Sequence, residues 1–368
     1  MKSNVYYMDL RASYKDSLLS KLGRLMDSAG LSRVVGKGEL VAVKLHFGER
    51  GNTAFIRPVF LREVVRRIKA AGGAPFLTDS NTLYRGTRSD ALCHLETAMQ
   101  NGFSHSVVDA PIIIADGLRG RNEIMVRIDK KRFQHVFVAS EIAHADAMVS
   151  VAHFKGHELT GFAGTLKNLG MGCASRRGKL AQHSNVSPRV KRKRCIGCED
   201  CVGHCPVGAI SVHEQKARID AERCIGCGEC IIICAAGAVG IRWSKSIPEF
   251  LEKMVEYAFG VLKEKNRKNL FLNFLTDVSP SCDCAPYNDA PIVGGIGVVA
   301  ADDPVAIDQA SVDLVNQQPV LPGSCLADRL DCSPDKFKAM YPKVDWALQL
   351  AYAEQLGMGT RDYNLVKI

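Results

Sequence analysis

Short apolar runs and amphipathic stretches alternate along the N-terminal part of the chain. The apolar runs predict strands at residues 5–10, 39–46 and 74–78, and the amphipathic stretches predict helices at residues 15–28, 58–71 and 88–100. Pro58 suits a first helical turn, and Gly72 with Gly73 ends the helix that follows it. This β-α-β-α order predicts a largely parallel sheet with polar loops at its carboxyl edge.

The pattern becomes more mixed beyond residue 110. Shorter strands are expected at 111–115, 123–128 and 135–140, partly antiparallel around residues 116–122, and then a buried strand at 147–152. After residue 244, Ser246-Ile-Pro-Glu249 predicts a capped helix, and strands follow at 269–274 and 297–300. Asp303-Pro304 opens a further helix, with Asp303 as its N-cap, and helices near 334–340 and 346–357 close the chain.

Between these two regions lies a cysteine-rich segment with an internal repeat. Two runs share the spacing C-x2-C-x2-C-x3-C, and residues 194–210 align with residues 223–239. This is the spacing of bacterial ferredoxins that hold two [4Fe–4S] clusters. Strand signals occur on both sides of the segment, and neither side is complete alone. We therefore expect an α/β fold with a mixed, largely parallel sheet core, at 1–188 and 244–368, and an inserted ferredoxin-like α+β dicluster module at 189–243.

The spacing predicts crossed ligation, because the fourth cysteine of each run starts a helix that points away from its own loop. One cluster takes Cys195, Cys198, Cys201 and Cys234; the other takes Cys224, Cys227, Cys230 and Cys205. Zinc knuckles and disulfides are the alternatives, but neither requires eight cysteines in two copies of one spacing.

The chain of 368 residues has a formal charge of +9. Part of the excess is a basic run before the first cluster motif: Arg189, Lys191, Arg192, Lys193 and Arg194. We expect this run to be a solvated face that also offsets the anionic clusters or docks an acidic electron-donor or acceptor protein. No aromatic residues or known reader motif accompany it, which argues against nucleic-acid binding.

The sequence shows neither a secretory signal nor a membrane-spanning segment. Residues 1–16 have no apolar signal core, and the longest apolar run, near residues 230–241, is too short to span a bilayer. Without an export signal, fourteen cysteines favour metal ligation or free thiols over a disulfide framework. The expectation is a cytoplasmic protein from an oxygen-poor environment.

The densest group of candidate functional residues outside the cysteine repeat lies between His153 and His183. It follows a buried strand, is punctuated by glycine, and contains Lys155, His157, Glu158, Lys167, Asn168 and Lys179. Such a junction suits a small anionic ligand, held by backbone N–H groups and lysine. The alternative is a solvated loop whose glycines only allow turns.

Other candidates follow strands or form a close pair. Asp79 ends a strand, and His46, His153 and His157 could ligate a metal or carry protons. Cys282 and Cys284 flank Asp283, too close for an unstrained disulfide, and either bind a metal, face a substrate or are ordinary thiols. Cys173 lies in the glycine-rich segment, and Cys93 is expected in the core. No nicotinamide or flavin signature stands out. A flavin or an additional metal is possible but not indicated, since flavin sites often lack short motifs.

The flanks resemble the uncharacterised iron–sulfur-centre proteins built on domain-of-unknown-function family 362. The likeness rests on VAVKLHFGERGNT at 41–53, KGHELTGFAGTLKNLGMG at 155–172, and the SCDC turn followed by ADDPVAID at 301–308. It implies an α/β core with an inserted ferredoxin module and a redox role, but no substrate. Ala235 stands where proline often follows the last cysteine.

Three functions fit these observations. The first is an oxidoreductase whose two [4Fe–4S] clusters relay electrons to a substrate or cofactor in the α/β core, with Lys155, His157, Lys167, Asn168, Asp79, Cys282 and Cys284 as candidate catalytic residues. The second is a non-enzymatic electron carrier or redox-sensing partner protein. The third is a non-redox enzyme with structural clusters. A pure carrier has little need for the segment from His153 to His183, which favours the first.

Overall fold

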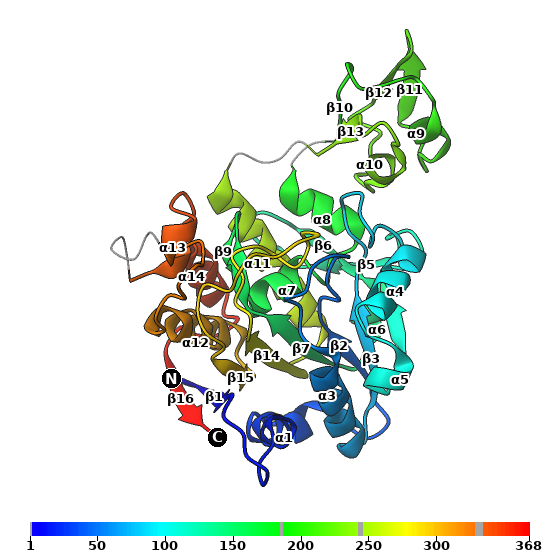
Figure 1. Cartoon of the computed structure of the whole chain (residues 1–368). Helices are drawn as coiled ribbons and strands as arrows, with labels where there is room; N and C mark the ends of the chain where they lie inside the picture. The colour runs from blue at the N-terminus through cyan, green and yellow to red at the C-terminus, as the bar shows by residue number, and fades with distance from the viewer. Residues whose placement is uncertain (1, 185–186, 242–245, 328–333) are drawn as a thin grey trace.

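The architecture was obtained as a computed structural model, which describes residues 2–184, 187–241, 246–327 and 334–368 (Figure 1). Its centre is an eight-stranded sheet in the order β16-β1-β15-β14-β7-β2-β3-β4. The strands of this sheet are β1 (Ser3–Asp9), β2 (Leu40–Lys44), β3 (Ala74–Asp79), β4 (Ile112–Ile114), β7 (Ala147–His153), β14 (Asn269–Leu275), β15 (Gly297–Ala301) and β16 (Tyr363–Lys367).

The sheet is mostly parallel. Neighbours from β14 through β7, β2 and β3 to β4 all run parallel, whereas β15 is antiparallel to both β1 and β14. The mixed, largely parallel core expected from the sequence is therefore confirmed. Strand β16, which pairs with β1, was not predicted.

Two hydrophobic layers enclose the sheet because successive strand residues point to opposite faces. Val41 and Val43 of β2 pack in one layer, with α1 (Leu18–Ser28) and α3 (Pro58–Ala70), while Ala42 packs in the other. That second layer contains α7 (Thr165–Gly170), α11 (Ile247–Glu264), α12 (Pro304–Gln317) and α14 (Ala347–Gln355).

Several helix ends follow the local chemistry of the sequence. The Ser246 side chain accepts a hydrogen bond from the Glu249 N–H at the start of α11. Asp303 caps α12 by accepting from the N–H groups of Val305 and Ala306, each at 2.9 Å. Both caps were predicted.

Three details of the sequence prediction are wrong. Helix α4 (Ala91–Gln100) begins after the N-cap Asp90, so Arg88 lies in the preceding loop. Cys93 is exposed, because the buried face of α4 carries Ala91, His94, Thr97 and Ala98. The segment 111–115 does not form a hairpin across residues 116–122: β4 extends the main sheet, and β5 (Glu123–Arg127) pairs with β6 (His135–Ala139).

The remaining elements are short. They are α2 (Leu31–Val34), α5 (His105–Val108), α6 (Ser140–His144), α8 (Arg176–His183), α13 (Lys336–Met340), and the hairpin of β8 (Lys155–His157) and β9 (Gly161–Ala163). No helix among the described residues is both long and apolar enough to cross a membrane.

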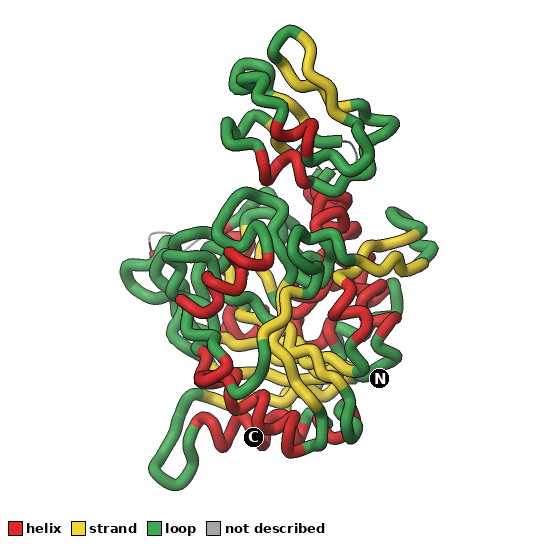
Figure 2. Tube along the Cα trace, turned by 90° about the vertical axis from the view of Figure 1, so that its right-hand side faces the viewer, coloured by secondary structure: helices red, strands yellow, loops and turns green. Residues whose placement is uncertain are grey.

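The cysteine-rich segment forms its own small unit at one end of the molecule (Figures 1 and 2). It consists of β10 (Arg189–Val190), α9 (Asp200–Gly203), β11 (Ile210–His213), β12 (Lys216–Ile219), α10 (Glu229–Ile233) and β13 (Val239–Gly240). Strand β10 pairs with β13, so the two ends of the segment lie side by side. In the core, β7 pairs directly with β14 across the segment, which is the geometry that an insertion requires.

Candidate functional site

A cavity of about 250 Å³ opens at the carboxyl ends of the parallel strands. Strand β2 brings Lys44 and His46 to it, β3 ends at Asp79, and β7 ends at His153. Ligand sites of open α/β sheets form at this edge because all parallel strands end there. The cavity is therefore a candidate functional site by its position as well as by its lining.

All seven candidate catalytic residues line this one cavity: Asp79, Lys155, His157, Lys167, Asn168, Cys282 and Cys284. Strand β8 supplies Lys155 and His157, helix α7 supplies Lys167 and Asn168, and the loop after β14 supplies the two cysteines. Glu158 and Lys179 also line it. Their chemical roles stay predictions, because only their positions are observed.

Asp79 is the centre of a buried ionic cluster. Its carboxylate lies 3.1 Å from Lys44 Nζ and 3.5 Å from an Arg88 nitrogen, and His94 is 3.8 Å away. Burial alone would raise the pKa of Asp79, but Lys44 and the neighbouring His46, His94 and Arg88 hold that pKa well below its ordinary value. Asp79 is therefore a permanent anion that fixes cations at the cavity, not a poised proton donor.

Asn168 holds Lys44 in place. Its Oδ1 accepts from Lys44 Nζ at 2.8 Å, and its Nδ2 donates to Ser150 Oγ at 2.9 Å and to the Lys44 carbonyl at 3.2 Å. Gly172 is close by, where a Cβ would come within 2.5 Å of Lys44 Nζ. The amide of Asn168 is thus engaged within the protein, which is the geometry of a positioning residue.

Asp283 forms a second buried centre behind the cavity. Its carboxylate lies 2.9 Å from both His153 Nδ1 and Lys155 Nζ. The other ring nitrogen of His153 contacts the Thr276 carbonyl at 2.9 Å, and a carbonyl can only accept a hydrogen bond. Both ring nitrogens of His153 are therefore engaged within the protein, which leaves neither of them for a metal.

His46 and His157 differ from His153, because each accepts a backbone hydrogen bond at Nδ1. The Gly48 N–H donates to His46 Nδ1 at 2.9 Å, and the Leu159 N–H donates to His157 Nδ1 at 3.1 Å. Burial lowers the pKa of both imidazoles well below the ordinary value. Each ring is neutral, with its proton on Nε2, and therefore offers a hydrogen-bond donor.

Cys282 and Cys284 lie on the cavity wall, and Cys282 is next to Lys167. Interaction with the neighbouring Cys284 thiol, opposed by burial and helped by Lys167 and Lys155, holds the pKa of Cys282 well below its ordinary value. The pKa of Cys284 is raised well above it, first by the same interaction and then by burial. Lys167 Nζ lies 3.6 Å from Cys282 Sγ. These neighbours therefore favour the thiolate form of Cys282 at the cavity wall.

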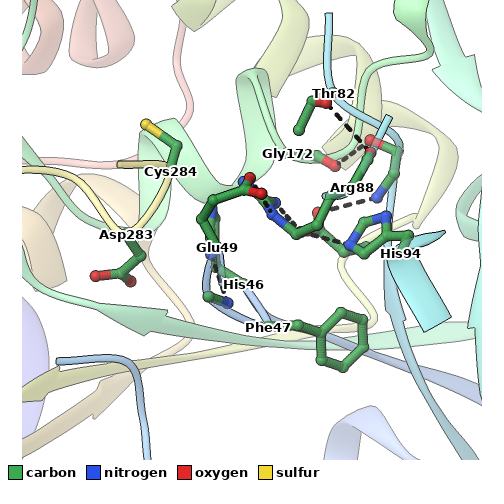
Figure 3. A network of polar contacts seen from close by, with 12 residues as sticks. His46, Phe47, Glu49, Thr82, Arg88, His94, Gly172, Asp283 and Cys284 are labelled. Carbon is green, nitrogen blue, oxygen red and sulfur yellow. Dashed lines mark hydrogen bonds and ion pairs between the residues drawn. The ribbon is translucent and has the colours of Figure 1, made fainter. Parts of the chain in front are cut away.

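Several residues of the site were missed from the sequence. Figure 3 shows Arg88 between Glu49 and His94, with Asp283 and Cys284 on the far side of Glu49. Arg88 Nε lies 3.2 Å from Glu49, and its Nη2 donates to the Tyr84 hydroxyl at 2.8 Å. A lysine inside an apolar strand, as at Lys44, is a signal of a buried ion pair. Arg88 lies in a turn-rich loop and gives no such signal.

The cavity also has an apolar wall. It consists of Leu83, Leu159, Met171, Ile241 and Phe250. The ring of Phe250, in the first turn of α11, stacks on His183 with a centroid distance of 4.8 Å and an interplanar angle of 18°. The sequence pattern gave Phe250 no role, because it reads only as part of an amphipathic helix.

The eight repeat cysteines surround two further, small cavities. One is lined by Cys195, Cys198, Cys201 and Cys234, and the other by Cys205, Cys224, Cys227 and Cys230. These are the two sets that crossed ligation requires. All eight thiols are free of disulfides. Among the described residues, no group of three or more His, Cys, Asp or Glu side chains is arranged to hold a metal ion.

The cysteine unit has an internal twofold repeat in its backbone. Gly197 and Gly226, near the start of each loop, have φ of 69° and 71°, a conformation that favours glycine. The Ala209 N–H donates to Cys205 Sγ and the Ala238 N–H to Cys234 Sγ, each at 3.2 Å. Backbone N–H groups that point at thiolate sulfur are one of the means by which proteins tune iron–sulfur clusters. The residues present therefore fit two [4Fe–4S] clusters, whose binding is a prediction.

The second four-cysteine cavity lies against the α/β core. Arg176 Nη1 is 2.8 Å from Glu229, which lies between Cys227 and Cys230, and both side chains are buried. Leu83 and Leu180 of the core pack in one hydrophobic cluster with Cys230 and other residues of the unit. Helix α8 carries Arg176 and Leu180 on this contact, and its Lys179 and His183 line the α/β cavity. One helix therefore joins the two sites.

Comparison with known proteins gives a family but no curated relative. No curated protein sequence matches the chain. Among solved structures, the lactate racemase apoprotein from Thermoanaerobacterium thermosaccharolyticum superposes with a TM-score of 0.46 at 13% identity, over 87% of this chain and 58% of that chain. A protein from Thermotoga maritima superposes with a TM-score of 0.37 at 12% identity, over 70% of this chain and 49% of that one. This chain thus spans about half the length of either structure. The family described as domain of unknown function (DUF362) matches residues 41–313, and the chain belongs to that family.

Proposed function

We propose that this chain is an iron–sulfur redox protein, an oxidoreductase whose two [4Fe–4S] clusters relay electrons to a substrate or cofactor bound in the α/β cavity. The observation that carries the proposal is the shared wall between the second four-cysteine cavity and the α/β cavity. Helix α8 contacts both, and so does the loop 82–84, whose Leu83 packs beside the cysteine unit and lines the α/β cavity. Bound clusters would supply single electrons at this wall.

The side chains of the α/β cavity are suited to hold and orient a ligand. Asp79 and Asp283 are ionised in the interior and fix Lys44 and Lys155 at the rim of the cavity. Placing ionised groups in a protein interior costs free energy unless they are paired and hydrogen-bonded, as these are. An electron carrier has no need of such a cluster around an enclosed space, so the arrangement favours an enzyme.

A separate observation supports a protein partner. Ile196 is 67% exposed and Ile225 is 41% exposed, at corresponding positions of the two cysteine loops. Exposed apolar side chains beside a redox centre, with the basic residues 189–194 nearby, suit docking of an acidic electron-transfer protein. In the alternative function, a non-enzymatic carrier, this surface would be the active one and the α/β cavity would be inert.

Metal analysis of anaerobically purified protein tests the proposal. We expect about eight irons and about eight sulfides per chain, with a visible absorption that bleaches on reduction. Cys198→Ser and Cys227→Ser should each weaken a different cluster in electron paramagnetic resonance spectra. Cys93→Ser, at an exposed cysteine outside the repeat, is the matched control and should change neither. Stoichiometric zinc in place of iron would refute the iron–sulfur assignment.

A further inference from the structure

The hydrogen-bond donors at the α/β cavity suggest which class of ligand it takes, if the proposed function is right that a substrate binds there. His46 and His157 both present an Nε2–H, because a backbone N–H already donates to each Nδ1. His157 Nε2 lies 4.0 Å from Glu158, too far for a hydrogen bond. Both donors line the cavity and are available to a ligand acceptor.

Two lysines add positive charge beside these donors. Lys155 Nζ contacts Asp283 and the His153 carbonyl, which leaves one ammonium hydrogen. Lys167 Nζ contacts the Cys282 sulfur at 3.6 Å and no carboxylate among the described residues, and it keeps hydrogens for a ligand. Lys179, by contrast, gives its hydrogens to Ser80 and to the carbonyls of Asn81 and Ala174. Lys155, Lys167 and the two imidazoles therefore offer donors that match an oxyanion, while Cys282 and Glu158 on the same lining add negative charge.

The apolar wall excludes a simple inorganic anion as the best ligand. These apolar residues come from four places: Leu159 from the β8–β9 turn, Met171 from the residue after α7, Ile241 from the residue after β13, and Phe250 from α11. A small inorganic ion would leave these surfaces against water, whereas a hydrocarbon body would cover them at about 25 cal/mol per Å² of apolar area. The flat, stacked ring of Phe250 favours a planar body.

The volume limits the size of the ligand. A space of about 250 Å³ has room for about eight water molecules, taking about 30 Å³ each. That is slightly below the range of about 300 to 1,000 Å³ for sites of drug-sized ligands. We infer that the cavity binds a small carboxylate with a planar, apolar body, its oxygens at Lys167 and the Nε2–H of His157 and its body against Phe250 and Met171.

Calorimetry on the anaerobic, cluster-containing protein tests this inference with four probes. Benzoate has both features, benzamide lacks the charge, acetate lacks the body, and phosphate is an inorganic anion. We expect benzoate to bind about tenfold or more tighter than each of the other three, where tenfold corresponds to about 1.4 kcal/mol. Equal binding of acetate or phosphate, equal binding of benzamide, or no binding of benzoate would each overturn it.

Variants test separately the preference for a charged ligand and the preference for an apolar body. Lys167→Met should abolish the preference for benzoate over benzamide, and Met171→Ala should reduce the preference for benzoate over acetate. Phe250→Leu should also reduce the preference for benzoate over acetate, because it removes the flat ring. It keeps most of the hydrophobic volume, so it serves as a second test if Met171→Ala does not fold. Lys131→Met, at an exposed lysine that pairs with Glu252 and does not line the cavity, is the control and should change neither. If Lys167→Met keeps the full preference for the charged probe, the inference is wrong.

Failure of the inference and failure of the proposed function can be told apart. The titrations use oxidised protein and need no electron transfer, so they report on the ligand class alone. The iron and sulfide analysis reports on the clusters alone. Benzoate binding with no iron at the repeat cysteines would retain the ligand class and reject the redox role, and the reverse result would reject only the ligand class.

Discussion

Arg176 of the α/β core and Glu229 of the cysteine unit form an ion pair at 2.8 Å, in which neither side chain is more than 2% exposed. Arg176 also donates to the Thr82 carbonyl at 3.3 Å, and Arg119 lies 3.0 Å from the other oxygen of Glu229. Because Glu229 lies between two repeat cysteines, this pair fixes the second four-cysteine site against the cavity wall.

Arg176→Met should loosen that contact. Removing one partner of a buried ion pair costs about 3–5 kcal/mol, and we expect the lower part of this range because Arg119 and Arg121 still face Glu229. Chemical denaturation should show the loss, and proteolysis should release the cysteine unit sooner than in the wild type. Arg192→Met removes an exposed pair with Glu214 and should cost at most about 1 kcal/mol. Equal effects of the two variants would contradict a docking role for Arg176.

Replacing residues 191–244 with a short Gly/Ser linker should leave a folded α/β core. Strands β7 and β14 pair with each other without the cysteine unit, and β10 and β13 bring its two ends together. Circular dichroism and size-exclusion chromatography should show a compact, folded protein. Metal analysis should find no cluster iron, because all eight repeat cysteines lie within the replaced segment. If the shortened chain aggregates at every temperature, the cysteine unit is integral to the core and the division at 189–243 is wrong.

The sequence predicted the sheet well because its parallel strands are buried on both faces. Apolar runs such as 39–46 and 147–152 need no tertiary information to be recognised. Strand β16 was missed because it lies at the edge of the sheet and four of its five residues are exposed, so no apolar pattern marks it. Helix α4 was started too early because several cap residues, Thr87, Ser89 and Asp90, follow one another, and spacing does not show that Asp90 is the one that caps the helix.

The site was only partly predictable, because the sequence locates residues that follow buried strands but not residues that packing brings to the cavity. Polar residues that follow buried strands converge at one edge, and this rule located Asp79, Lys155 and His157 at one cavity. Arg88 and Phe250 enter from a loop and from a helix, and their distance from the cavity depends on packing that spacing does not encode. Asp303 was predictable because its role is local: it caps α12 as expected, and it also accepts from Ser3 and Thr360.

Alkylation of Cys282 tests the state of the thiol pair. Because the pKa of Cys282 is held well below its ordinary value, its reaction with iodoacetamide should stay nearly level as the pH falls through the ordinary thiol pKa of about 8.5. Cys284→Ala removes the main stabilising hydrogen bond, and Lys167→Met removes a nearby positive charge. Both variants should raise the pKa of Cys282, so the rate should drop in that pH window. Mass spectrometry of the Cys282 peptide provides the rate, and a wild-type rate that falls steeply near pH 8.5 would contradict a stabilised thiolate.

A redox titration of Lys179→Gln tests most directly whether the α/β cavity and the second four-cysteine site act together. Lys179 lines the cavity on α8, the helix that carries Arg176 to Glu229, and burial lowers its pKa to about 8. Its positive charge below that pH should stabilise added electrons nearby. Paramagnetic resonance should therefore show a more negative midpoint potential for the site of Cys205, Cys224, Cys227 and Cys230 in Lys179→Gln, with the other site unchanged. Lys216 donates to the Cys195 carbonyl, so Lys216→Gln should make the potential of the site of Cys195 more negative and leave the site of Cys205 unchanged. Unchanged potentials at both sites in Lys179→Gln, or a shift only at the site of Cys195, would contradict the relay.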